Sequence, residues 1–299
     1  MNGIDISKYQ KQIDWSKVSG IEFALVRIGM GNDEKQVDPC YRRNVDQALS
    51  HGFYVGGYYF SYATSIADAQ KEADVCNALL QPYKGKLLFP IGYDYEYASA
   101  DYFAKVKGRA PTNVEIDSFA CAFCDRMKSY GWFVNVYTNI DYYRSGKFKT
   151  AIKKYDVWLA DYNGSPDYPC YIQQTGSTGK IPGISGNVDT NISFRDYPTM
   201  IKAKGYNGYP KPKDTSVWID TTINVYFPKG NNYIFATESD ATPKVTVGTA
   251  GVVNLSHVNR VENKDYWKLT FIGNPGQSCG IYTAASGEQP TKRFIAYVD

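Results

Sequence analysis

Short apolar runs without a helical period alternate with amphipathic patterns along the first 200 residues. A strand covered on both faces shows such a run, because neither side of it meets water. Eight short strands are predicted, at 3–6, 23–28, 53–60, 87–95, 133–137, 157–161, 170–174 and 187–191. Apolar residues at helical spacing predict helices near 41–49, 66–80 and 116–131.

Alternation of strands and helices favours a parallel sheet, and eight strands favour a closed barrel. The last three strands follow one another too closely for crossover helices, which need about a dozen residues or more. The expected fold is therefore an α/β protein, with an irregular TIM-like (β/α) barrel of eight strands over residues 1–202.

The pattern changes after the barrel. Residues 203–216 are rich in Gly, Pro and Lys, a composition typical of a linker. From 217 to 299 apolar and polar residues alternate between turn signals, which predicts an all-β module of about six or seven strands. Acidic and basic residues balance in this module, so binding by bulk charge is not expected.

Composition excludes several classes of function. The net charge of +3 is too small to indicate nucleic-acid binding, and no apolar run is long enough to span a membrane. Six scattered Cys and two His do not form a zinc motif, so free thiols and no metal or cofactor are expected. The 27 Tyr suit sugar rings, although they could equally be aromatic residues at the core edge.

Two carboxylates end the fourth predicted strand. Asp94 and Glu96 are two residues apart, so on a strand they project to the same side. Burial and like charge both raise a carboxyl pKa, which is the condition that a general acid needs. The alternative is that one or both acids are salt-bridged or solvated at a strand end.

Other polar and aromatic residues occur at the ends of the predicted strands. Active sites of (β/α) barrels lie at the carboxyl ends of the strands. The residues expected there with Asp94 and Glu96 are Asp5, Tyr58, Tyr137, Trp158, Asp161, Gln174 and Asp189. Several acids and aromatic side chains on one rim predict a polar pocket.

In order and spacing, the barrel segments resemble a glycoside hydrolase family 25 lysozyme, the muramidase of phage endolysins and bacterial autolysins. The resemblance is carried by Gly3–Ser7, Asp38 to Gly52, Gly57–Phe60, Asp94–Glu96, Tyr137–Asn139, Trp158–Tyr162 and Gly183–Asn191. Two tripeptides, Tyr58–Phe60 and Gln173–Thr175, depart from it. Tyr59 stands where the family often has His, and Gln173 and Thr175 stand where it often has Trp and Tyr; both departures are expected to touch the rim.

The resemblance implies a function for each acid. Glu96 corresponds to the general acid and Asp94 to its carboxylate partner, while Asp5 and Asp189 correspond to two further acids. Sugar contacts are implied for Tyr58, Tyr137, Trp158, Gln174 and Tyr162. The implied reaction cleaves the bond between N-acetylmuramic acid and N-acetylglucosamine with retention. Asp94 could either attack the anomeric carbon itself or assist attack by the substrate's own acetamido group, and the sequence favours assistance.

Alternatives remain open at this point. A non-catalytic glycan-binding barrel, a hydrolase of another glycan such as chitin, and a bacterial autolysin all fit part of the pattern. The C-terminal module resembles the SH3-like wall-binding modules of lysins in size and position only, and it could instead serve solubility or self-association. Without a signal peptide, synthesis in a host cytoplasm and release to the wall during phage-induced lysis are expected.

Overall fold

The structure, a computed structural model, describes residues 1–210 and 217–299. The chain divides into two compact units, Met1–Pro212 and Lys213–Asp299, and each is described by itself. No helix among the described residues is long and apolar enough to cross a bilayer.

The first unit is a closed barrel in which the strands follow one another in sequence order from β1 to β8. Its strands are β1 (Asn2–Ile6), β2 (Phe23–Met30), β3 (Tyr54–Phe60), β4 (Ile91–Asp94), β5 (Val134–Asn139), β6 (Asp156–Ala160), β7 (Ile172–Gly179) and β8 (Val188–Ser193). Neighbours from β1 to β7 are parallel, whereas β8 is antiparallel to both β7 and β1. The predicted barrel and its irregular end are both confirmed.

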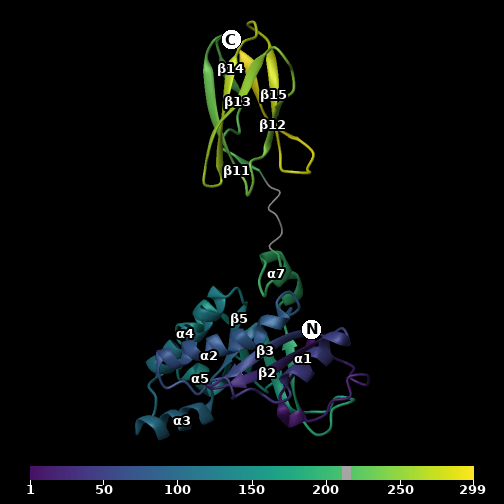
Figure 1. Ribbon diagram of the computed structural model, residues 1–299, viewed down its shortest axis with the longest axis vertical. Helices are drawn as coiled ribbons and strands as arrows, with labels where there is room; N and C mark the ends of the chain where they lie inside the picture. The colour runs from purple at the N-terminus through teal and green to yellow at the C-terminus, as the bar shows by residue number, and fades with distance from the viewer. Residues whose placement is uncertain (211–216) are drawn as a thin grey trace. The chain divides into compact units, whose positions relative to one another are not determined.

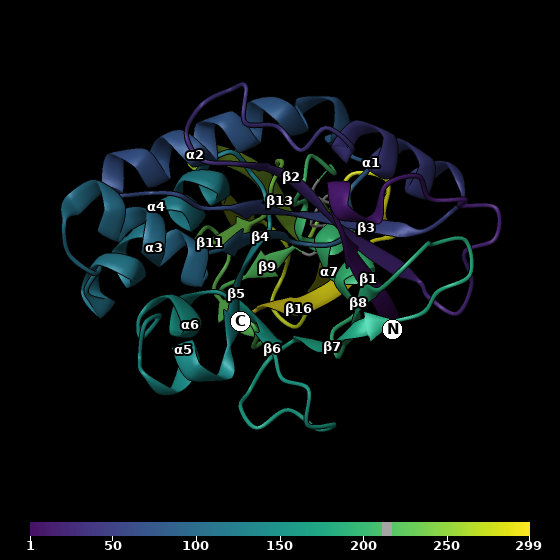
Figure 2. The same ribbon diagram turned by 90° about the horizontal axis from the view of Figure 1, so that it is seen from below.

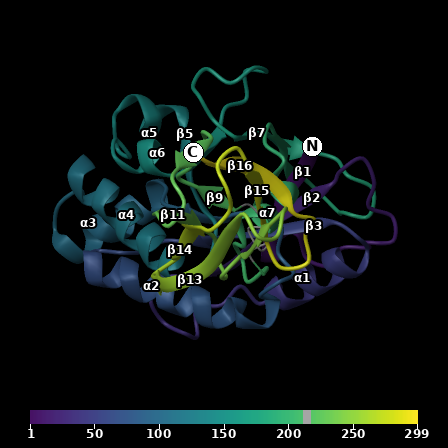
Figure 3. The ribbon, with the colours of Figure 1, turned by 90° about the horizontal axis from the view of Figure 1, so that it is seen from above.

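Helices cover the barrel wall unevenly. Seven α-helices and two 3-10 turns are found in the described part of this unit: η1 (Lys8–Gln10), α1 (Tyr41–Ser50), α2 (Ile66–Leu80), η2 (Gln81–Tyr83), α3 (Tyr97–Lys107), α4 (Asn113–Ser129), α5 (Ile140–Arg144), α6 (Ala151–Lys154) and α7 (Tyr197–Lys204). In the end-on views, α1 to α6 lie outside β2 to β6, while loops flank β7 and β8 (Figures 2 and 3). This asymmetry follows from the short connections late in the chain.

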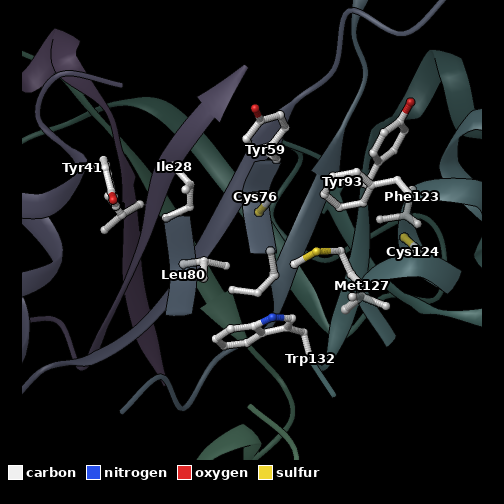
Figure 4. Packing of buried hydrophobic residues seen from close by; sticks show 14 of the residues in the cluster. Ile28, Tyr41, Tyr59, Cys76, Leu80, Tyr93, Phe123, Cys124, Met127 and Trp132 are labelled. Carbon is white, nitrogen blue, oxygen red and sulfur yellow. The ribbon is translucent and has the colours of Figure 1, made fainter. Parts of the chain in front are cut away.

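The largest apolar cluster fills the layer between the barrel wall and its helices. Strand residues such as Ile28, Tyr59 and Tyr93 pack against Leu80 of α2 and Met127 of α4 (Figure 4). A second cluster fills the barrel interior and includes Phe23, Phe89 and Trp158. Gly3 makes room for it, because a Cβ there would lie 2.4 Å from the Phe23 ring.

Helix α7 and the residues after it close one end of the barrel. Tyr197 and Ile201 of α7 belong to the interior cluster. The Asn207 side chain is fully buried; it donates to Leu87 O and Phe89 O and accepts from Phe133 N. The predicted linker, 203–216, thus begins inside α7 and includes a buried residue, while its part from 211 to 216 lies outside the described residues.

Several elements differ from the expectation. Strand β4 is shorter than the predicted 87–95, because Pro90 has no N–H to donate to a neighbouring strand. Helices α3 and α7 were not predicted, since exposed polar residues blur the apolar stripe of each. The expected strand end at Glu96 is instead the N-cap of α3, still in an extended conformation.

The described part of the second unit, 217–299, is all-β, as predicted, but has eight strands rather than six or seven. The strands are β9 (Trp218–Ile219), β10 (Val225–Phe227), β11 (Asn232–Glu238), β12 (Lys244–Val247), β13 (Val253–Val261), β14 (Lys264–Phe271), β15 (Ser278–Ala284) and β16 (Thr291–Val298). They form two four-stranded sheets, β10-β16-β15-β12 and β13-β14-β11-β9 (Figure 1). One apolar cluster unites residues of both sheets, including Phe235, Leu269, Ile281 and Phe294. That this unit is an SH3-like barrel stays a prediction.

Candidate active site

Each strand of the barrel contributes an inward side chain to one end of the interior. These residues are Asp5 on β1, Arg27 on β2, Tyr58 on β3, Asp94 on β4, Tyr137 on β5, Trp158 on β6, Gln174 on β7 and Asp189 on β8. Register pairs such as Asp94 with Tyr137 and Tyr137 with Trp158 bring consecutive members side by side. The alternation of strand side chains therefore places a closed ring of polar and aromatic groups at the rim.

This ring lines a cavity of about 650 Å³. Glu96, two residues beyond the end of β4, also lines the cavity. Tyr9, Phe60 and Tyr62 line it as well. An adjoining hollow of about 360 Å³ shares Glu96 and Tyr137 and adds Tyr97, Asn139, Asp141 and Tyr162. Glu96 thus borders two adjacent spaces, which suits a group that acts on a bond between two sugars.

Asp189 reaches the rim by a route that differs from the expectation. It was expected at the carboxyl end of a parallel strand, but it lies near the start of β8, Val188–Ser193. Because β8 runs antiparallel to β1, its beginning lies at the same end of the barrel as the strand ends of β1 to β7. Asp5 and Asp189 are direct register partners across this pair of strands.

The carboxyl groups of Asp94 and Glu96 lie close enough to affect each other's pKa, and both are at least partly buried. Burial raises the pKa of Asp94 well above its usual range, and the neighbouring Glu96 raises it further. Burial also raises the pKa of Glu96. Since Asp94 is almost fully buried and Glu96 is only half-buried, the pair keeps a proton that the outer member can pass to a ligand.

The backbone of Glu96 is fixed by the start of α3. Its N–H donates to Ser99 Oγ at 3.1 Å, and Ser99 is fully buried. This bond is the reciprocal half of a helix-capping arrangement, so the turn between β4 and α3 holds Glu96 in place. Asp94 Oδ1 is buried and has no hydrogen-bond partner among the described residues, which leaves it available to a ligand.

Asp5 and Asp189 belong to a second group of hydrogen-bonded residues. Asp5 Oδ2 accepts from Gln174 Nε2 at 2.8 Å and from Asn191 Nδ2 at 2.9 Å. Gln174 Oε1 in turn accepts from the hydroxyls of Tyr137 and Tyr162. Burial, together with the nearby Asp189 carboxylate, raises the pKa of Asp5 to about 7.

Aromatic rings form one wall of the cavity. Trp158 contacts Tyr58 and Tyr137 edge-on, with ring centroids 5.8 and 4.8 Å apart. The Trp158 Nε1–H donates to Asn191 Oδ1 at 2.8 Å, so its orientation is fixed from both sides. The predicted sugar-contacting residues Tyr58, Tyr137, Trp158 and Gln174 all line the same cavity as the four acids, and Tyr162 joins them through Gln174.

Sequence reasoning missed a buried ion pair beneath the rim. Arg27 Nε donates to Asp38 Oδ2 at 2.9 Å, and Asp38 also accepts from the backbone N–H groups of Lys8 and Cys40. Asp38 thus joins the segment after β1, strand β2 and the start of α1. The only signal in the sequence was an Arg inside an apolar strand, which needs a carboxylate partner when buried.

Three predicted rim residues point elsewhere. Asp161 is buried and accepts from Asn163 N and Asp167 N, so its carboxylate stabilises a loop. Tyr59 faces the helices and donates to Gly31 O, and Gln173 donates to Asp161 O and Gly164 O. The two departures from the family pattern therefore do not touch the cavity, contrary to the expectation, because neighbours on a strand face opposite sides.

Comparison with known proteins places this geometry in a family. The family model of glycosyl hydrolases family 25 matches residues 4–183. Lysozyme M1 of Streptomyces globisporus is 24% identical over 204 residues, which cover 64% of this chain and 67% of that protein. The protein YegX of Escherichia coli O157:H7, itself uncharacterised, is 25% identical over 201 residues, covering 64% and 69% of the two chains.

Among solved structures, the modular autolysin LytC of Streptococcus pneumoniae, in complex with a synthetic peptidoglycan ligand, superposes with a TM-score of 0.55 at 26% identity. The match covers 64% of this chain and 46% of the autolysin, so this chain spans less than half the length of that relative. The family match extends over most of the barrel and includes Asp5, Asp94 and Glu96. The chain belongs to glycosyl hydrolases family 25 and is a glycoside hydrolase of the lysozyme kind.

Proposed function

We propose that the chain is an N-acetylmuramidase, which cleaves the β-1,4 bond between N-acetylmuramic acid and N-acetylglucosamine in peptidoglycan with retention. The observation that carries the proposal is the position of Glu96. It borders both the four-acid cavity and the adjoining hollow, and its pKa is raised by burial. A sugar in each space would bring the bond between them to this carboxyl group.

The reaction begins with proton transfer from the Glu96 carboxyl group to the glycosidic oxygen as the C1–O bond breaks. The carbonyl oxygen of the muramic acid acetamido group attacks C1 and forms a cyclic oxazolinium ion. The one proton of the pair is on Glu96, so Asp94 acts as the carboxylate: it accepts from the acetamido N–H and stabilises the positive charge that develops on the ring. Glu96 then removes a proton from water, which attacks C1, so the configuration is retained.

Asp5 and Asp189 support this step from the opposite side of the cavity. Their hydrogen bonds to Gln174 and Asn191 fix two further polar groups beside the reacting sugar. Because burial and the nearby Asp189 raise the pKa of Asp5 to about 7, Asp5 adds less negative charge at neutral pH than an exposed aspartate does. This arrangement limits the repulsion on the Asp94 carboxylate.

Replacement of the general acid tests the proposal. Glu96→Gln should lower the rate of lysis of purified walls by ~10²–10⁴, because the amide cannot donate a proton to the leaving oxygen. Thermal unfolding should be nearly unchanged, since Glu96 is half-buried and its backbone bond to Ser99 is retained. Lysis at a rate close to that of the wild type would contradict the assignment. The matched control is Glu34→Gln, an exposed carboxylate that lines neither the cavity nor the adjoining hollow.

We also propose that the second unit anchors the enzyme to the wall and that the activity serves phage-induced host lysis. The anchoring proposal is supported by the second unit having an apolar core of its own. A hydrolase of an insoluble polymer gains from a separate unit in the same chain that binds that polymer. The setting in phage lysis is tested by expressing the chain in a bacterial host with and without a membrane pore. Lysis that depends on the pore would support it, and lysis without the pore would contradict it.

A further inference from the structure

The outer face of one sheet of the second unit carries an unusual set of side chains. In β16, Phe294, Ala296 and Val298 are buried, so Ile295 and Tyr297 project outward. In β15, Cys279 and Ile281 are buried, so Ser278, Gly280 and Tyr282 project to that same outer face. Solvent-facing positions of a sheet are often charged, whereas these five residues are uncharged and two of them are aromatic.

Two tyrosines on neighbouring strands stack on this face. Tyr226 of β10 and Tyr297 of β16 are register partners, with ring centroids 4.7 Å apart and planes inclined by 7°. Tyr226 is 55% exposed although it is stacked. It lies on the edge strand of the sheet, so one side of the stack is open to a ligand.

A third ring of the same face, that of Tyr282, covers two glycines, Gly248 and Gly280. A Cβ on Gly280 or Gly248 would come within 2.9 Å of the Tyr282 ring. The absence of side chains at these positions lets the ring lean back along β15 and cover the backbone. Tyr297 is the register partner of Ser278, a small residue without a ring or a charge.

The face is also uncharged where the stacked pair lies. Ser278, Gly280, Ile295 and Tyr297 carry no ionic group, whereas Lys292 is the register partner of Tyr282 and Lys244 that of Ala284, toward one end of the face. The outer face of the other sheet differs, because Lys264 lies over Trp218 and pairs with Glu238. Exposed aromatic groups with hydroxyls and no charge suit pyranose rings, whose faces are apolar and whose edges are hydroxylated.

We propose that Tyr226, Tyr297 and Tyr282 form a glycan-binding surface that holds the sugar strand of peptidoglycan. This inference rests on the proposed peptidoglycan substrate. Binding of the same polymer by a tethered second unit raises the effective concentration of substrate at the catalytic barrel. The occupant is the glycan strand itself, since the stacked tyrosines and Ser278 opposite Tyr297 carry no charge to complement anionic wall polymers.

The test measures binding of the full-length chain to peptidoglycan sacculi stripped of secondary polymers. Glu96→Gln is present in every protein so that the sacculi are not digested. Combined Tyr226→Ala and Tyr297→Ala substitutions should weaken binding by at least about tenfold, the scale of an exposed aromatic contact that dominates an interface. Tyr226→Phe with Tyr297→Phe keeps the rings and should stay within about threefold of the parent.

The matched control is Trp218→Ala, which removes a ring of similar exposure, 51%, from the outer face of the other sheet. Binding should then change by less than about twofold. Loss of binding with Trp218→Ala but not with the tyrosine variants would overturn the proposal, as would unchanged binding in all of them. If the double variant unfolds, Tyr226→Ala alone decides, because Tyr226 lies exposed on an edge strand.

Hydrolysis of a soluble, uncross-linked glycan by the same tyrosine variants with Glu96 intact separates this inference from the proposed function. Unchanged hydrolysis together with weaker binding to sacculi supports the surface. Absence of hydrolysis in the wild type would count against the muramidase assignment alone. Dimers that dissociate in the tyrosine variants, with binding to sacculi intact, would assign the face to a second copy of the chain and overturn the glycan surface.

Discussion

At the scale of single residues, burial determines which carboxyl groups of the barrel hold a proton. Asp94 and Glu96 lie at the cavity, and their raised pKa values serve the proposed chemistry. Glu72 of α2 is different, since it is fully buried and forms no ion pair with any described residue. It accepts from Ser61 Oγ at 2.6 Å and from Tyr62 N at 2.7 Å, which holds the loop after β3.

Glu72 should make stability depend on pH. Burial raises its pKa from 4.5 to about 8, so the folded state binds this proton more tightly than the unfolded chain does. The stabilisation is therefore complete below pH 4.5 and is lost as pH rises to about 8. Glu72→Gln removes this titration. Between pH 5 and 8 the free energy of unfolding should therefore decrease in both proteins, but the decrease should be smaller in Glu72→Gln than in the wild type, by at least ~1 kcal/mol.

Denaturant titrations of both proteins across that pH range check this prediction. A parallel loss of stability in wild type and Glu72→Gln would contradict it. The control is Glu115→Gln, because Glu115 pairs with Arg109 at the surface and its pKa is lowered to about 2, outside the window.

The acids of the site could be predicted from the sequence because they terminate apolar strands, where a charged group is conspicuous. Asp94 and Glu96 were found by spacing alone, and Asp5 and Asp189 by their places on the first and last strands. The hydrogen-bonding residue Asn191 and the Arg27–Asp38 pair were not recognised as parts of the site. Their partners are up to 186 residues apart in sequence, so no local pattern marks them.

At the scale of elements, regular alternation was predictable and its exceptions were not. Strands β1 to β3 and helix α2 follow from apolar periodicity, whereas the direction of β8 depends on how the sheet closes. The end of the barrel unit was set too early at 202, because the Gly, Pro and Lys content of 203–216 resembles a linker. Asn207 has φ +56°, in the left-handed region, and its side chain is bonded to three backbone groups.

Loss of Asn207 should therefore destabilise the barrel. Asn207→Gly keeps the left-handed backbone and loses the side-chain bonds, which leaves Phe133 N without its acceptor and should cost ~2–4 kcal/mol. Asn207→Ala should cost about 1 kcal/mol more, because its Cβ disfavours this conformation. Denaturant unfolding of fragments 1–202 and 1–210 gives a second check, since only the longer one contains Asn207. Equal stability of the two fragments would contradict this account.

At the scale of the whole molecule, catalysis and wall binding are assigned to different compact units. Each unit has its own apolar cluster, so each can be altered without exposing the core of the other. Family membership rests on residues 4–183 and carries no information on the second unit. The function of that unit therefore has to be argued from its surface.

Removal of the second unit should separate the two activities. A fragment of residues 1–210 should cleave a soluble glycan at the rate of the full chain, because every residue of the proposed catalytic cavity lies within it. Its binding to insoluble sacculi should fall by ~10² or more, the usual gain from a tethered second contact. Pull-down on sacculi and a soluble-substrate assay measure the two quantities. Unchanged pull-down would show that the barrel alone anchors the enzyme.

The most direct test of the central claim is the chemical identity of the reducing ends released from purified peptidoglycan. Soluble products are reduced with borohydride and analysed by mass spectrometry. The proposed cleavage predicts N-acetylmuramic acid at every new reducing end with the wild type, and none with Glu96→Gln. New reducing ends of N-acetylglucosamine, or equal release by the variant, would contradict the account.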